Sequence, residues 1–341
     1  MGIKHWREAA TVILTAQSRK KPSNNFKILT LKRSERNDFM PGGYVFPGGN
    51  IHPSDSNIKW LDHFQKFKFD NLNKIFMVNG EVPELFKDED NEVPKAVSLR
   101  IAAIRETFEE SGILLCKDVN VTNETQNFTG YKYFPDLECW RSKVQKDGFE
   151  FFNLCQNFNC YPDIKGLHLW SDWLTPRTEL GKRFDTAFFL ASIDEIPKGD
   201  ADETEVENLS WRTANDLLKA SEAKEIWLPP PQVYEIARIL RFQKIEDLYS
   251  FASKISAQGC ERWMPERVNT KNGIVTLLPG DEAYKVDDYS TTDKVINVNQ
   301  TNEEYRSKLS VLHRMEHVNK FDTKIIIKNY FPKHGHVVPI S

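Results

Sequence analysis

The sequence lacks the features that mark several classes of protein. Its five cysteines form no Cys-x-x-Cys pair, which argues against a disulfide framework or a zinc site and favours a reducing compartment. No run of about 18 apolar residues could cross a bilayer, and the first residues do not have the layout of a signal peptide. We therefore expect a soluble, intracellular protein without a membrane partner. No targeting motif distinguishes cytoplasm, peroxisome or mitochondrion.

A strong excess of charge is also missing. The 341 residues carry a formal net charge of −3, with 46 Lys and Arg against 49 Asp and Glu. This balance argues against nucleic acid as a partner, whereas a local basic patch for a small phosphorylated ligand remains compatible with it. Hydrophobic residues make up 40% of the chain, which is enough for one large domain or two small ones with a buried core.

Local patterns predict a chain of mixed α and β structure. Apolar, β-rich segments predict strands at 10–17, 26–32 and 186–193, and the turn-rich segment 41–49 predicts a short strand between tight turns. Helices are expected at 213–222 and 230–256, and mostly helical inserts at 57–76 and 137–160. No pattern assigns the segment 261–341.

The helix expected from 95 to 111 is the best-defined element. Pro94 marks its start, and Gly112 is the expected C-cap. Apolar residues at helical spacing predict a stripe that faces the core, made by Val97, Ile101, Ile104 and Phe108.

Three carboxylates, Glu106, Glu109 and Glu110, share the opposite side of this helix. They form one patch on a helix that advances by about 100° per residue. Neighbouring carboxylates repel one another unless a cation is present, and oxygen ligands of this kind suit Mg²⁺ or Mn²⁺. Taken alone, the patch is more simply a solvated acidic face, so the surrounding residues decide between the two interpretations.

The surrounding residues resemble the Nudix box. Phe46-Pro47-Gly48-Gly49 precedes the helix, which ends in Arg105-Glu106-Thr107-Phe108-Glu109-Glu110-Ser111-Gly112-Ile113. The family pattern is Gly, five residues, Glu, seven residues, and then Arg-Glu-apolar-x-Glu-Glu-x-Gly-apolar, with Gly49 as its first glycine. The resemblance implies an α/β Nudix fold, an α/β/α sandwich around a mixed sheet, with helical insertions and a C-terminal extension.

Two positions depart from the family pattern. Asp55 stands six residues after Gly49, where the family has Glu, and Thr107 stands where an apolar residue is usual. The step from Asp55 to Arg105 is 50 residues, far longer than in the compact box, so an insertion splits the motif. Whether the short Asp55 side chain reaches Arg105 is open at this point.

A box split in this way resembles the Nudix motif 19 type, which are coenzyme A and acyl-CoA diphosphatases. The likeness follows short segments in the same order along the chain, at 6–12, 160–164, 173–176, 183–189, 228–232 and 278–282. We accordingly expect a Nudix hydrolase domain over 1–260, with inserts at about 50–95 and 130–172. A C-terminal extension over 261–341 is expected to pack on the same domain.

The resemblance implies metal-dependent cleavage of coenzyme A or acyl-CoA to 3′,5′-ADP and 4′-phosphopantetheine or its acyl form. It implies Glu106, Glu109 and Glu110 as ligands of Mg²⁺ or Mn²⁺, and Arg105 as the residue that orients the loop and the helix. The candidate general bases are Glu109, Glu110 and, in the acidic run 202–207, Glu205. The candidate substrate contacts are Gly48, Gly49, Arg33, Arg36 and Arg183, with Lys182 as a further cation.

Several alternatives stay open at the level of sequence. The substrate could instead be ADP-ribose or NADH, or the chain could be a catalytically silent Nudix-fold module that binds a nucleotide or protein partner. Residues 183–186 could simply be the polar start of a buried strand, and the prolines at 229–231 are expected to set a turn before a helix. His313 and His317 are expected on a helix surface. The oligomeric state is not indicated.

Overall fold

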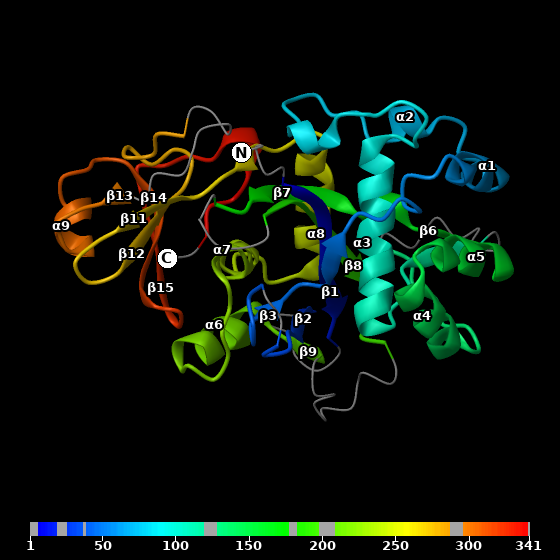
Figure 1. Ribbon diagram of the computed structural model, residues 1–341, viewed down its shortest axis with the longest axis horizontal. Coiled ribbons are helices and arrows are strands. Elements are labelled where there is room, and N and C mark those ends of the chain that lie inside the picture. Colours follow the sequence, from blue (N-terminus) through cyan, green and yellow to red (C-terminus); the bar gives the residue numbers. More distant parts are fainter. Residues whose placement is uncertain are drawn as a thin grey trace.

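A mixed eight-stranded sheet forms the centre of the computed structural model (Figure 1), which describes residues 6–18, 26–36, 39–118, 128–176, 183–197, 209–286 and 296–339. Its strands are β1 (Arg7–Gln17), β2 (Phe26–Lys32), β3 (Tyr44–Val45), β4 (Gly48–Asn50), β7 (His168–Leu174), β8 (Phe184–Ile193), β9 (Leu209–Arg212) and β10 (Arg262–Trp263). They follow the order β10-β7-β8-β1-β2-β3, with β4 paired to β1 and β9 to β2. The sheet is mixed because β1 is parallel to β8 and antiparallel to β2.

Helices cover both faces of this sheet. One face carries α3 (Lys95–Ser111), and the other carries α6 (Ala214–Glu222), α7 (Pro230–Ile239) and α8 (Ile245–Ser256). Along β1, Val12 and Leu14 join the apolar cluster of α3, whereas Ile13 joins the cluster of α7 and α8. The expected α/β/α sandwich is confirmed. Within the described ranges, no helix has the length and apolarity that crossing a bilayer requires.

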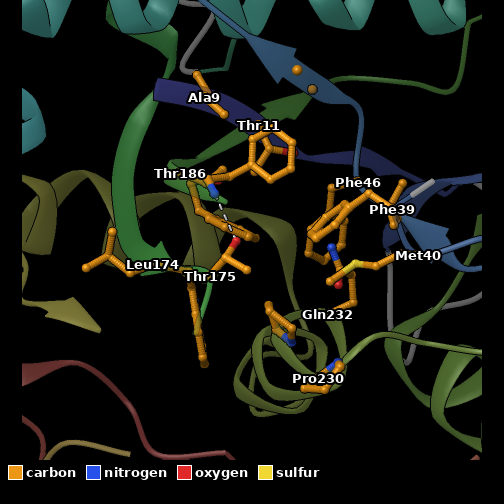
Figure 2. Close-up of a pocket in the computed structure, with 18 of the residues that line it drawn as sticks. Ala9, Thr11, Phe39, Met40, Phe46, Leu174, Thr175, Thr186, Pro230 and Gln232 are labelled. Carbon is orange, nitrogen blue, oxygen red and sulfur yellow. Dashed lines mark hydrogen bonds between the residues drawn. The ribbon is translucent and has the colours of Figure 1, made fainter. Parts of the chain in front are cut away.

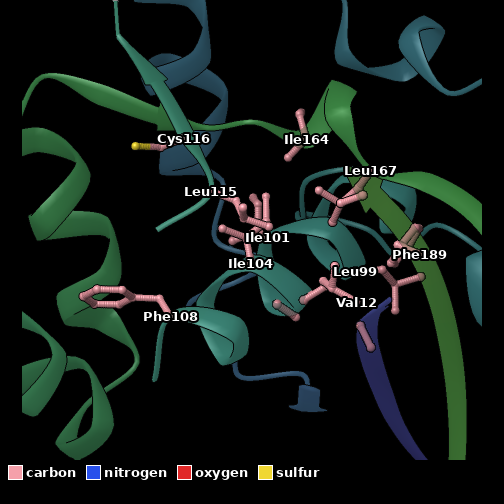
Figure 3. Packing of buried hydrophobic residues seen from close by; sticks show 14 of the residues in the cluster. Val12, Leu99, Ile101, Ile104, Phe108, Leu115, Cys116, Ile164, Leu167 and Phe189 are labelled. Carbon is pink, nitrogen blue, oxygen red and sulfur yellow. The ribbon is translucent and has the colours of Figure 1, made fainter. Parts of the chain in front are cut away.

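Helix α3 begins and ends where the sequence predicts. Pro94 precedes its first turn, and Gly112 ends it in the left-handed conformation (φ 77°), with its N–H donating to the Phe108 carbonyl at 2.8 Å. The predicted apolar stripe is fully buried (Figure 3). Thr107 is buried too, and its hydroxyl donates to the Ala103 carbonyl at 2.7 Å. A polar side chain is therefore accommodated where the family has an apolar one.

Two helical inserts cover the side of α3 that faces away from the sheet, and the helical content predicted for both is confirmed. The first contains α1 (Lys59–Lys66), α2 (Leu72–Ile75) and η1 (Glu84–Phe86). The second contains α4 (Leu137–Lys146) and α5 (Phe149–Asn157), with β5 (Cys116–Asp118), β6 (Cys160–Pro162) and η2 (Ile164–Gly166) beside it. The inserts pack on each other, since the Trp60 ring lies 4.9 Å from that of Phe152 and 6.1 Å from that of Phe151.

The C-terminal segment forms a second sheet, drawn from yellow through orange to red in Figure 1. Its elements are β11 (Glu266–Asn269), β12 (Ile274–Leu277), β13 (Ile296–Asn297), α9 (Asn302–Arg306), β14 (Leu312–Asn319) and β15 (Asp322–Lys328), followed by η3 (Lys333–Gly335). The buried Asp281 carboxylate accepts two hydrogen bonds from the Arg314 guanidinium, at 2.7 and 2.6 Å. Met315 and Ile325 belong to the same apolar cluster as α7, so this sheet packs on the main domain.

Two predictions are wrong. The segment 230–256, predicted as one helix, forms two: α7 ends at Ile239 and α8 starts at Ile245. No glycine or proline marks the break; the chain turns there so that α8 packs on β7. His313 and His317 lie on strand β14 rather than on a helix, and His313 is fully buried, with Nδ1 and Nε2 bonded to the Pro279 carbonyl and the Tyr234 hydroxyl.

Candidate active site

Two glycines bring the backbone against the carboxylates of α3. The N–H of Gly48 donates to Glu110 Oε2 at 2.9 Å. A Cβ on Gly49 would lie 2.4 Å from Glu106 Oε2, and one on Gly48 would lie 2.4 Å from the Ala10 carbonyl oxygen. No side chain fits at Gly48, where a Cβ would meet backbone, and a side chain at Gly49 would displace the Glu106 carboxylate, so the two glycines allow this turn to approach α3 closely.

The Arg105 guanidinium holds the surrounding acceptors in place. Its Nε and Nη2 donate to the two oxygens of Asp55, both at 2.9 Å, and Nη2 also donates to the Asn50 carbonyl at 2.9 Å. Its Nη1 donates to Glu106 at 3.0 Å and to Glu109 at 2.6 Å. The Arg105 and Asp55 side chains are 4% and 1% exposed, so this two-pronged ion pair is almost completely shielded from water.

The short Asp55 side chain reaches Arg105 because its loop folds tightly. The Asp55 N–H donates to the His52 carbonyl at 2.8 Å, and Asp55 Oδ2 accepts from the His52 N–H at 2.8 Å. The far end of the insertion returns to the same place, since the Val93 N–H donates to the Ser56 carbonyl at 3.1 Å. The insertion therefore closes on itself and leaves Asp55 beside α3.

The carboxylates of α3 are short of positive charge. Burial raises the pKa of Glu106 to about 7, with Arg105 opposing the shift and the two neighbouring carboxylates adding to it. Glu110 is more exposed, and desolvation by the surrounding protein raises its pKa to about 7, against the Gly48 N–H and the Arg33 cation. Partly desolvated carboxylates that lack a full complement of cations have the donor chemistry of a divalent metal site.

The side chains do not stand in a ready three-ligand arrangement. Among the described residues, no group of three or more His, Cys, Asp or Glu side chains is placed to hold a metal ion. Glu109 is paired with Arg105, and Glu110 with the Gly48 N–H. Glu106 and Glu110 nevertheless line one cavity together, so two of the three predicted ligands face the same space.

This cavity has a volume of about 450 Å³ and lies between the glycine turn and the N-terminal end of α7 (Figure 2). Its acidic end is formed by Glu106 and Glu110. Most of its remaining wall is apolar and includes Phe39, Met40, Phe46, Trp173, Leu174, Pro230 and Pro231. Pro265 and Thr276 also line it, so the C-terminal sheet contributes to the cavity. The prolines thus both start α7, as predicted, and form part of the wall.

The predicted cations are distributed unevenly around the cavity. Arg33 lines it, and its buried Nε has no hydrogen-bond partner among the described residues. Arg36 is exposed and does not line it. Arg183 is half-buried immediately before β8 and next to Phe184, which does line the cavity. Glu205 and Lys182 lie outside the described residues.

Two supporting contacts have no signal in the sequence. Arg141 of α4 donates to the backbone carbonyls of Glu109 at 2.9 Å and Glu110 at 2.7 Å, and Gln145 donates to the former at 2.7 Å. These bonds satisfy carbonyls at the C-terminal end of α3. A polar residue in an insert gives no hint of such a role, because the contact depends on how the insert folds back.

The orientation of Trp173 in the cavity wall depends on a buried acid. The carboxylate of Glu235, which is fully buried, accepts from Trp173 Nε1 at 2.8 Å, Trp170 Nε1 at 2.7 Å, Ser171 Oγ at 2.8 Å and Arg238 Nη1 at 3.0 Å. A single glutamate in an apolar helix is visible in the sequence, but three of its donors lie on β7, which only the fold brings against α7. Sequence analysis therefore missed it.

The Asp55–Arg105 pair generates a test of stability. We expect Asp55→Asn to lower the free energy of unfolding by about 3 kcal/mol, because it leaves a buried guanidinium without its main counter-charge. Urea denaturation of the variant and of Asp62→Asn, a change at an exposed acid of α1, measures the difference. A loss at Asp55 no larger than that at Asp62 would contradict the assignment.

Comparison with known proteins identifies relatives over nearly the whole chain. The family model described as the NUDT19 Nudix domain matches residues 6–239, and that of the NUDT19 C-terminal domain matches residues 267–327. The acyl-coenzyme A diphosphatase NUDT19 of Xenopus laevis is 34% identical, covering 99% of this chain and 97% of its own length. The human protein of the same name is also 34% identical, covering 99% and 96%.

A solved structure supports the fold independently. A Nudix hydrolase from Alicyclobacillus acidocaldarius superposes with a TM-score of 0.51 at 21% identity, covering 73% of this chain and 97% of its own. At this level of identity the likeness bears on the fold alone. Nudix hydrolases as a class generally use divalent metal ions.

Proposed function

The chain belongs to the NUDT19 family of Nudix hydrolases, and we propose that it cleaves the diphosphate linkage of coenzyme A or acyl-CoA. The products are 3′,5′-ADP and 4′-phosphopantetheine or its acyl form. One observation carries the proposal: a single cavity joins the carboxylates of Glu106 and Glu110 to a long apolar wall. Such a cavity suits a ligand that has a diphosphate at one point and an apolar arm beyond it.

The acidic end of the cavity suits a divalent cation. Glu106, Glu109 and Glu110 supply the hard oxygen ligands that Mg²⁺ and Mn²⁺ prefer. When bound, such an ion would neutralise charge on the diphosphate and lower the pKa of a coordinated water. Arg105 fixes the positions of Glu106 and Glu109 through its two Nη1 hydrogen bonds.

The reaction is a hydrolysis in which water adds to one phosphorus and the bond from that phosphorus to the bridging oxygen breaks. One proton of the water passes to a carboxylate, and the displaced phosphate leaves as an anion. Glu110, which faces the cavity, is our first candidate for that base, and Glu205 is the second. Arg33 is placed to neutralise a phosphate oxygen, because it lines the same cavity and its charge already acts on Glu110.

The substrate class is tested by offering the purified protein equal concentrations of coenzyme A, acyl-CoA, ADP-ribose and NADH with Mg²⁺ or Mn²⁺. We expect 3′,5′-ADP to be the main nucleotide product, identified by mass spectrometry, and its formation to stop when the metal is chelated. Preferential cleavage of ADP-ribose or NADH would indicate another diphosphatase. Absence of turnover on the whole panel would indicate a binding module.

A substitution at the acidic end tests the assigned carboxylate. We expect Glu110→Gln to lower kcat for coenzyme A by about 10² or more, because the site loses a charge where charge stabilisation dominates catalysis. Glu222→Gln, at an exposed position at the end of α6, serves as the matched control and should keep wild-type turnover. A folded Glu110→Gln protein with near-normal kcat would remove Glu110 from the mechanism.

The two neighbouring arginines provide a second matched pair. We expect Arg33→Met to raise KM for coenzyme A about tenfold or more, since a charge-assisted hydrogen bond contributes about 1.5–3 kcal/mol. Arg36→Met removes the same charge three residues away, outside the cavity lining, and should change KM less than about twofold. Equal effects of the two changes would show that positive charge near the cavity attracts the substrate without a specific contact from Arg33.

A further inference from the structure

A second cavity of about 720 Å³ lies away from the candidate active site. The two cavities share no lining residue among those described. Helix α3 and strand β7 contribute to both cavities. Arg100 of α3 and His168 of β7 line the second cavity, whereas Glu106 of α3 and Trp173 of β7 line the first. In Figure 1, α2 lies beside the end of α3 that borders the second cavity.

The wall supplied by the first insert is apolar. It is made by Leu72, Ile75, Phe76, Met77, Val82 and Phe86. Met77 and Val82 are 70% and 43% exposed, which places two large apolar side chains at the opening of the cavity. Exposed apolar side chains gathered around a cavity are typical of ligand-binding sites.

Backbone hydrogen bonds fix this wall to α8. The Asn79 N–H donates to the Ala257 carbonyl at 2.8 Å, and the Cys260 N–H donates to the Glu81 carbonyl at 3.1 Å. The segment between α2 and η1 is thereby joined at two points to the end of α8. The cavity is therefore bounded by anchored backbone on both sides.

A buried cation faces this cavity. Arg100 is 3% exposed and lines it, and no carboxylate of the described residues forms an ion pair with it. Its Nε donates to the Leu167 carbonyl at 3.0 Å and its Nη1 to the Ala96 carbonyl at 2.6 Å, whereas Nη2 has no hydrogen-bond partner in the described part of the chain. Its guanidinium carbon lies 3.8 Å from the ring centroid of Phe76. Burial lowers the pKa of Arg100 to about 9, since a buried charge without a counter-ion is costly.

The other polar groups that line the cavity include one further donor without a partner. Buried Nε2 of His168 has no hydrogen-bond partner among the described residues, and burial together with the Arg100 charge lowers the pKa of His168 to about 4, so this imidazole is neutral at pH 7. The Asp88 carboxylate, which also lines the cavity, accepts from the Lys95 N–H at 2.7 Å. The Lys165 ammonium lies 4.5 Å from the Phe69 ring centroid.

We propose that this cavity binds an amphiphilic carboxylate of the long-chain fatty acid class. The carboxylate accepts from Arg100 and His168, and the aliphatic chain lies along the apolar wall of the first insert towards Met77 and Val82. The ligand supplies the negative charge that the buried guanidinium lacks, and it covers the apolar side chains that the fold leaves exposed. The proposal does not depend on the proposed hydrolase activity, because neither cavity uses residues of the other.

A photoreactive analogue of palmitate with a diazirine in its chain tests the site in the full-length protein. We expect saturable labelling, mapped by mass spectrometry to peptides that contain residues 72–86. An analogue of the same chain length that ends in an alcohol should label at least about tenfold less, because it lacks the charge that pairs with Arg100. Equal labelling by the alcohol would overturn the proposed recognition of a carboxylate.

Matched substitutions locate the binding site. Arg100→Met removes the cation. Met77→Asp places a negative charge, of the same sign as the ligand, at the opening of the cavity, and it should not affect folding because Met77 is exposed. Both should reduce labelling at least about tenfold, while Ile58→Asp, at an exposed apolar residue of the same insert outside the cavity, should not. The Glu110→Gln protein should label like the wild type, which separates this test from that of the enzymatic function. Labelling at residues 39–46 or 173–176, unchanged labelling of Met77→Asp, or no saturable labelling would each overturn the proposal.

Discussion

The buried guanidinium of Arg105 is the constraint on which the site depends. It joins the loop that carries Asp55 and Asn50 to the acidic face of α3, although Asp55 and Arg105 are 50 residues apart in the sequence. The insertion between them closes on itself through the Val93–Ser56 hydrogen bond. Both ends of the long insertion are therefore held beside α3, and Asp55 and Asn50 stay within reach of Arg105.

Elements outside the motif complete the functional surfaces. The second insert bonds to the last carbonyls of α3 through Arg141, and the C-terminal sheet adds Thr276 to the wall of the first cavity. The first insert forms the apolar wall of the second cavity. The first insert is thus part of one cavity and the C-terminal sheet part of the other, while the second insert supports the end of α3, which gives a structural reason for the length of this chain.

The sequence predicts those elements whose signals are local. The limits of α3 follow from Pro94, Gly112 and an apolar period, and the strands and inserts follow from similar patterns. The contact of Asp55 with Arg105 could not be predicted, because it depends on how a loop far away in the sequence folds. In the C-terminal sheet, the two-residue β13 pairs with β11, and β12 pairs with β14, across long stretches of chain, so no single window of sequence contains the pattern of the whole sheet. The spacing of His313 and His317 wrongly indicated a helix, because residues four apart share a face on a strand as well.

We propose that the acidic face of α3 binds a divalent cation beside the first cavity. Titration of the protein with Mn²⁺, followed by electron paramagnetic resonance of the free ion, tests it most directly, with Glu106→Gln measured alongside. We expect saturable uptake by the wild type and an affinity at least about tenfold lower in the variant, which loses a charged oxygen ligand. Absence of uptake by the folded protein, or equal affinity in the two proteins, would contradict it.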